Sequence, residues 1–168
     1  GLYPGSAITD KTPELIEACK VSLLDRGFGQ KSGANGSGWG KANKVNLWAR
    51  AKDGNRAYSM LRELINKNIA PNLWDFHPPY QMDGNCGYTS GVCEMLCYSS
   101  DDIIELLPAL PEEWKNGSVK GLCARGGYSL DFTWENGEIK SLSVYSSCGK
   151  KTARIKTGDE IKTVKTVG

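Results

Sequence analysis

The residues best suited to chemistry lie in the segment from His77 to Asn85, which reads HPPYQMDGN. Its polar side chains are an imidazole, two amides and a carboxylate: His77, Gln81, Asp83 and Asn85. Pro78 and Pro79 exclude a regular helix at their positions and stiffen the backbone. Gly84 permits close approach of another group or an unusual backbone conformation. A stiff segment with several polar side chains is suited to binding a small polar ligand.

Three aromatic residues, Trp74, Phe76 and Tyr80, lie among or just before these polar groups. Aromatic faces pack on the C–H surfaces of sugars, and planar polar groups hydrogen-bond to sugar hydroxyls. Inverting glycoside hydrolysis needs a carboxylic acid on one side of the bond and an activated water on the other, about 6.5–9.5 Å apart. Asp83 suits the activation of the water, either as the base itself or as a group that orients the base.

A structural interpretation of the same residues stays open. Asp-Gly-Asn is also an ordinary turn sequence, and Asp83 can simply cap a following helix. His77 can be a hydrogen-bonded structural histidine, and the three aromatic residues can be core residues. The composition of this segment therefore indicates a sugar site without establishing one.

The elements that must position these residues change in character near residue 101. Before it, apolar residues recur at helical spacing, and we expect helices at about 13–27, 40–51, 55–68 and 88–98. After it, the apolar period shortens, and we expect strands at 104–107, 119–124, 128–134, 139–145, 153–155 and 161–164. Asn136-Gly137 is a strong hairpin signal between two of these strands. We therefore predict an α+β chain with a boundary between residues 100 and 101.

Composition narrows the partners and the chemistry. The net charge of +2 comes from well-mixed positive and negative residues, so the chain has no strongly basic face and nucleic acid is not an expected partner. No apolar run reaches the length of about 18 residues that crosses a bilayer, so we expect no membrane span. The single histidine argues against a Cys/His metal site, and we expect no metal and no cofactor. We expect most of the six cysteines to be small buried residues: Cys19, Cys86, Cys93, Cys97, Cys123 and Cys148.

The string NLWDFHPPYQMDGN, residues 72–85, resembles the N-L-F-D-x-H-P-P-F-Q-I-D-G-N segment of glycoside hydrolase family 95. Further matching strings occur in the same order along the chain: LYPG at 2–5, NLWAR at 46–50, DGNRAY at 53–58, EML at 94–96, LLPALP at 106–111 and GSVKGL at 117–122. The resemblance thus covers nearly the whole chain. Members of this family are mainly α-L-fucosidases that act on α-1,2-linked fucose.

The resemblance implies a fold and a role for each site residue. Residues 1–100 would be the last helices of an (α/α)6 catalytic barrel, and residues 101–168 a small antiparallel β-sandwich-like C-terminal domain. Asp83 matches an aspartate that polarises an asparagine side chain, which activates the attacking water. His77 matches a histidine that contacts the sugar, and Gln81 and Asn85 complete the expected substrate-binding set.

Several features of the family have no counterpart in this chain. In the family, the glutamic acid that serves as general acid and the asparagines that activate the water come from earlier parts of the barrel. Glu94 is not expected to be the general acid. The implied partners are a fucosylated glycan and the remaining N-terminal part of the same enzyme, and the chain alone is expected to be inactive. A glycan substrate favours a bacterial extracellular or periplasmic location, although unpaired cysteines would allow the cytoplasm.

Two other classes of function remain as alternatives. A non-catalytic carbohydrate-binding module could use Trp114 and Trp134 as a sugar platform. A structural accessory domain that packs on a catalytic barrel would suit residues 101–168 on their own.

Overall fold

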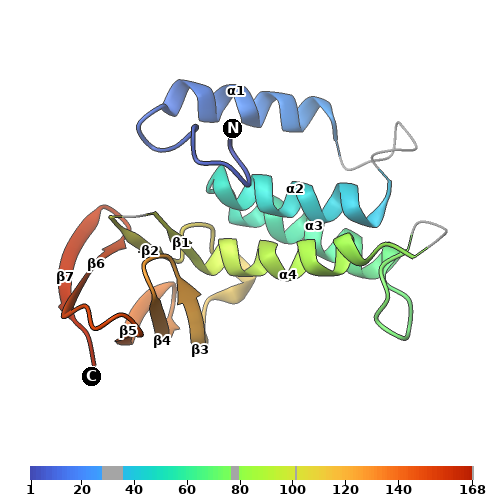
Figure 1. Cartoon of the computed structure of the whole chain (residues 1–168). Helices are drawn as coiled ribbons and strands as arrows, with labels where there is room; N and C mark the ends of the chain where they lie inside the picture. The colour runs from blue at the N-terminus through green and yellow to red at the C-terminus, as the bar shows by residue number, and fades with distance from the viewer. Residues whose placement is uncertain (28–35, 77–79, 101, 168) are drawn as a thin grey trace.

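The computed structural model describes residues 1–27, 36–76, 80–100 and 102–167. Helices occupy the first part of the chain and strands the second (Figure 1). The helices of the described residues are α1 (Pro13–Asp25), α2 (Gly38–Arg50), α3 (Gly54–Asn68) and α4 (Met82–Leu96). None of them is long and apolar enough to cross a membrane.

Helices α2, α3 and α4 form the packed centre of the helical part, and α1 runs alongside them on the side of α2 (Figure 1). The side chain of Ser37 caps α2 by accepting from the Gly40 amide, and Asp53 caps α3 by accepting from the Arg56 amide. Their buried residues, together with Met95 of α4, make one apolar cluster with the N-terminal segment. This cluster holds α4 against the other helices.

The second part contains two sheets. Their strands are β1 (Cys97–Ser99), β2 (Ile104–Leu106), β3 (Gly117–Ala124), β4 (Tyr128–Glu135), β5 (Glu138–Ser146), β6 (Thr152–Thr157) and β7 (Glu160–Lys165), with a short 3-10 helix, η2 (Glu112–Trp114), before β3. One sheet has the order β1-β2-β6-β7 and the other β3-β4-β5. All neighbouring strands are antiparallel except β2 and β6, which are parallel. The predicted hairpin at Asn136-Gly137 is confirmed, since both residues have positive φ and join β4 to β5.

The two sheets share one apolar core. Leu130, Phe132 and Trp134 alternate along β4 and are buried, and they pack with Ile104 of β2 and Ile155 of β6. This arrangement bears out the prediction of an α+β chain with helices first and a small, mostly antiparallel β part second. Four helices do not by themselves make an (α/α)6 barrel.

Three expectations from the sequence are wrong. Helix α4 begins at Met82, six residues before the predicted start at 88. It ends at Leu96, and the next three residues form strand β1 instead of continuing the helix. The cysteines are not mostly buried: Cys86, Cys93, Cys123 and Cys148 are exposed, Cys19 and Cys97 are partly buried, and all six are free.

Candidate active site

Helix α4 places Asp83 in its first turn, with the side chain exposed. Among the described residues, the Asp83 side chain makes no hydrogen bond and no ion pair. Gln81 lies immediately before the helix and is half-buried, and its Oε1 atom has no hydrogen-bond partner in the described structure. His77 lies outside the described residues. Asp83 is therefore an exposed carboxylate, unpartnered among the described residues, at the start of a helix, where negative charge is favoured.

Asn85 holds the preceding loop against the first turn of α4. Its Oδ1 atom accepts from the backbone N–H of Asp75 at 2.9 Å, and its Nδ2 donates to the carbonyl of Leu73 at 2.8 Å. Both ends of the amide are therefore engaged with the backbone on either side of Trp74. The half-buried Asn85 side chain has a structural role in this arrangement, whatever else it contacts.

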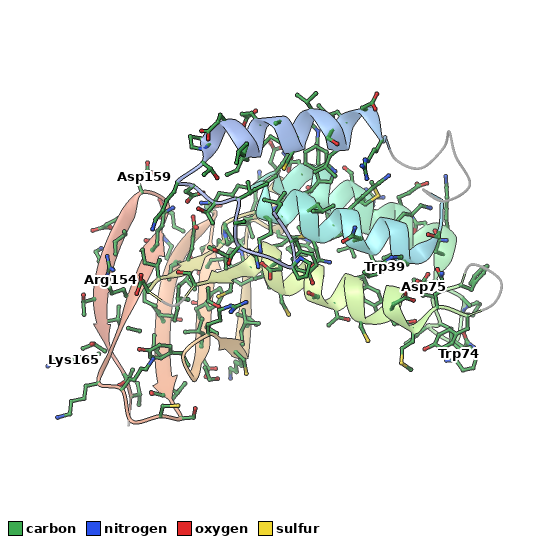
Figure 2. The ribbon with its side chains drawn as sticks, turned by 45° about the horizontal axis from the view of Figure 1, so that its top comes forward. Trp39, Trp74, Asp75, Arg154, Asp159 and Lys165 are labelled. Carbon is green, nitrogen blue, oxygen red and sulfur yellow. The ribbon has the colours of Figure 1, made fainter. Side chains whose placement is uncertain are left out.

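The loop held by Asn85 presents aromatic rings to solvent. Leu73 has φ of +69°, a conformation that residues with a side chain rarely adopt, and the Trp74 amide donates to Asn72 Oδ1 at 3.2 Å. The rings of Trp74 and Tyr80 are stacked at a tilt, with centroids 4.7 Å apart, and both remain exposed. Figure 2 shows Trp74 and Trp39 at the same end of the helical part. The exposed rings are not core residues in this chain.

Asp75 is buried next to the exposed aromatic rings of this loop. Its side chain is 0% exposed, and neither carboxylate oxygen has a hydrogen-bond partner in the part of the chain that the structure describes. A Cβ atom added to Gly38 would lie 1.6 Å from Asp75 Oδ1, and one added to Gly84 would lie 1.3 Å from Oδ2. The carboxylate therefore fills the space that two glycines leave open, one at the start of α2 and one in the first turn of α4.

Two nearby charges act on Asp75. Burial raises the pKa of its carboxyl above the ordinary value, and the negative charge of Asp83 raises it further. Lys41 acts in the opposite direction, from a buried position where its Nζ donates to Asn68 Oδ1 at 2.7 Å. Burial lowers the pKa of Lys41, and Glu63 partly offsets this effect. The site thus combines an exposed carboxylate with a buried one whose charged form is disfavoured.

Sequence reasoning did not single out Asp75, which appeared only as one letter of the matched string. The available signal was a carboxylate between two aromatic residues, Trp74 and Phe76, because an acidic side chain in an apolar stretch needs a specific place. Glu94, by contrast, lies three turns further along α4, and its carboxylate is occupied by Arg50, with Nη2–Oε1 at 3.2 Å. That pair is a structural contact away from the first turn of the helix.

An exposed carboxylate beside exposed aromatic rings is a combination that suits the binding and hydrolysis of a sugar. The family model of the glycosyl hydrolase family 95 catalytic domain matches residues 1–96, and that of the glycoside hydrolase family 95 C-terminal domain matches residues 98–167. The chain therefore belongs to glycoside hydrolase family 95.

Three relatives have fucosidase names. An α-L-fucosidase 2 from Arabidopsis thaliana is 36% identical over 159 residues, covering 87% of this chain and 18% of the relative. Probable α-fucosidases A from Aspergillus oryzae and Aspergillus niger are 33% and 31% identical, covering 81% and 93% of this chain and 21% and 22% of the relatives. The chain thus spans about a fifth of the length of these curated relatives.

Proposed function

We propose that this chain is the C-terminal part of an inverting α-L-fucosidase, which releases α-1,2-linked L-fucose from glycans. The observation that carries the proposal is the exposed Asp83 carboxylate at the start of α4, with no partner among the described residues. An exposed carboxylate without a partner among the described residues is available to a group outside this chain. Family membership and the fucosidase names of the relatives support the substrate class.

Asp83 is proposed to act through a second residue. It accepts a hydrogen bond from an asparagine amide supplied by another part of the enzyme, and that asparagine takes the proton of the attacking water. An amide is a weak base, and a hydrogen bond to a carboxylate makes it a stronger one. A glutamic acid, also from outside this chain, protonates the leaving oxygen on the opposite face of the sugar.

The residues around Asp83 are proposed to hold the substrate. The exposed Trp74 and Tyr80 rings offer apolar faces to the C–H surfaces of a sugar. Gln81 is proposed as a sugar ligand because its buried Oε1 atom has no hydrogen-bond partner among the described residues. His77 is proposed as a further sugar ligand on the strength of the matched motif. Asn85 is proposed to hold the Trp74 loop through its two hydrogen bonds to the backbone. The second N–H of its amide is proposed to donate to the substrate.

The same proposal divides the chain into two parts. Residues 1–100 contribute to the catalytic (α/α)6 barrel, and residues 101–168 form an accessory domain that packs on it. A carbohydrate-binding role for the β part is less well supported, because Trp134 is only 5% exposed and its Nε1 donates to the carbonyl of Trp114 at 2.7 Å. A ring in that position cannot serve as a sugar platform.

The full-length enzyme and a 2′-fucosylated oligosaccharide provide the test of the reaction. Proton NMR at early times should show β-L-fucose as the first product, because one displacement inverts the α-linked centre. The 168-residue chain alone should release no fucose from the same substrate. Release of α-L-fucose first would contradict the inverting mechanism, and turnover by the isolated chain would contradict the shared site.

A further inference from the structure

Asp75 is tied to the first turn of α4 at three points. Its backbone carbonyl accepts from the Gln81 amide at 3.0 Å, and its backbone N–H donates to Asn85 Oδ1 at 2.9 Å. Its side chain lies against Gly84, so close that no Cβ atom fits between them. Gln81 and Gly84 lie on either side of Asp83 in the sequence. Any movement of residue 75 must therefore be transmitted to the backbone that carries Asp83.

The carboxylate of Asp75 also joins α4 to α2. Its Oδ1 lies against Gly38, the first residue of α2, while its Oδ2 lies against the first turn of α4. Helix N-termini have partial positive charge and unsatisfied N–H groups, so both helix ends favour a nearby carboxylate. Gln81 at the N-cap of α4 makes no side-chain capping bond. Asp75 is thus the acidic group that the beginnings of α2 and α4 share.

We propose that Asp75 is a positioning residue for Asp83: wedged between Gly38 and Gly84, it fixes the first turn of α4 and so the direction of the Asp83 carboxylate. This inference rests on the proposed function, because it assigns Asp75 a task in the same reaction. A buried carboxylate with no hydrogen-bond partner among the described residues is unfavourable for stability alone, because it has been removed from water. The positioning of Asp83 explains why a buried carboxylate is present at residue 75.

The first test replaces Asp75 in the full-length enzyme by Asn or Ala. Displacement of a catalytic group by about 1 Å lowers a rate by about 100-fold. We therefore expect kcat on a 2′-fucosylated oligosaccharide to fall about 10-fold for Asp75→Asn, which keeps the shape, and about 100-fold for Asp75→Ala. KM should change less than kcat, because both variants keep the backbone groups of residue 75 that hydrogen-bond to Gln81 and Asn85. Circular dichroism and the unfolding temperature confirm that each variant is folded.

A double-mutant cycle then tests the contact through which Asp75 acts. Gly84→Ala introduces a Cβ into the carboxylate and should lower kcat strongly when Asp75 is present. In the Asp75→Ala background the clashing carboxylate is gone and only the Cβ of residue 75 remains close, at 3.1 Å, so the same change should cost much less. Gly87→Ala is the matched control on the same helix, since its Cβ would meet Ala42 Cβ at 3.0 Å and not Asp75. Its effect should be the same with and without Asp75.

The outcomes separate this inference from the proposed function. Folded Asp75→Ala and Asp75→Asn variants with unchanged kcat would overturn the positioning role, and so would an additive effect of Gly84→Ala. If Gly84→Ala does not fold, the kcat and KM of the two Asp75 variants decide the matter alone. If the unmodified enzyme does not hydrolyse the fucoside, or Asp83→Asn leaves its rate unchanged, the proposed function fails first.

Discussion

At the scale of single residues, two neighbouring carboxylates occupy opposite environments. Asp83 is exposed and free of described partners, whereas Asp75 is buried and its pKa is raised, first by burial and then by the charge of Asp83. The sequence motif identified Asp83 because its position within a matched string can be read directly. Burial cannot be read from the sequence, because it depends on two glycines, Gly38 and Gly84, that lie far apart along the chain.

Asp75 should make stability depend on pH in a defined direction. A raised pKa means that folded Asp75 holds its proton more tightly than the unfolded chain does, so its contribution is fully present below the ordinary value of 3.8 and is lost as the pH rises through the folded pKa. In the full-length enzyme, the unfolding temperature of Asp75→Asn minus that of the unmodified protein should therefore increase as the pH rises from about 3 to about 7. A decrease in this difference over the same pH range would mean that the pKa of Asp75 is lowered and not raised.

Asn85 is expected to act through the loop that it holds. Asn85→Ala removes two hydrogen bonds to the backbone and should lower the free energy of unfolding by about 1–3 kcal/mol, as measured by urea denaturation. Asn85→Asp keeps the acceptor for the Asp75 amide and loses the donor to Leu73, so its loss should be smaller. If Asn85 served only to bind sugar, Asn85→Ala would raise KM and leave stability unchanged.

At the scale of elements, helix α4 begins earlier than the sequence predicts, and its composition explains the difference. Two prolines and two glycines between residues 78 and 87 are typical of a loop, and glycine weakens a helix by about 1 kcal/mol relative to alanine. Packing outweighs this preference, because Gly84, Gly87 and Gly91 lie on one face of α4 and let it approach Asp75, Ala42 and Val45 closely. The spacing of three and four residues between these glycines was the helical signal available in the sequence.

The close approach of α4 to α2 can be tested at Gly91. A Cβ added there would lie 2.5 Å from Val45 Cγ1, so Gly91→Ala should destabilise the enzyme by about 1–3 kcal/mol despite its better helix propensity. Adding Val45→Ala should recover part of this loss in the double variant, because it removes the methyl groups that clash. A double variant no more stable than Gly91→Ala, in the same denaturation experiment, would mean that the two helices are not packed through these residues.

At the scale of the whole molecule, charged residues connect the helical part to the β part. Glu105 of β2 is largely buried and binds Lys52 at 2.8 Å and Lys156 of β6 at 3.1 Å, while both lysines also bind Asp10. Burial acts to lower the pKa of Lys156, but its hydrogen bonds to Asp10 and Glu105 outweigh this and raise it. The order of helices and strands could be predicted from apolar periods, whereas this connection could not, because its members are separated by most of the chain.

Glu105 is expected to couple the two parts. Glu105→Gln removes the negative charge that both lysines share and should destabilise the full-length enzyme by about 2–3 kcal/mol, less than a fully buried pair would lose, because Lys52 is partly exposed. Glu138→Gln is the matched control, because Glu138 pairs with Lys140 in an exposed position on β5. Equal unfolding temperatures for the two variants would contradict a structural role for the connection.

The most direct test of the central claim is the rate of the full-length enzyme with Asp83→Asn. If Asp83 strengthens the base that activates water, kcat on a 2′-fucosylated oligosaccharide should fall by about 10²–10⁴, with KM and the unfolding temperature close to those of the unmodified enzyme. Asp53→Asn is the control, because it changes a carboxylate at the start of another helix where Asn caps equally well. An Asp83→Asn enzyme that turns over as fast as the Asp53→Asn control would contradict the role assigned to Asp83.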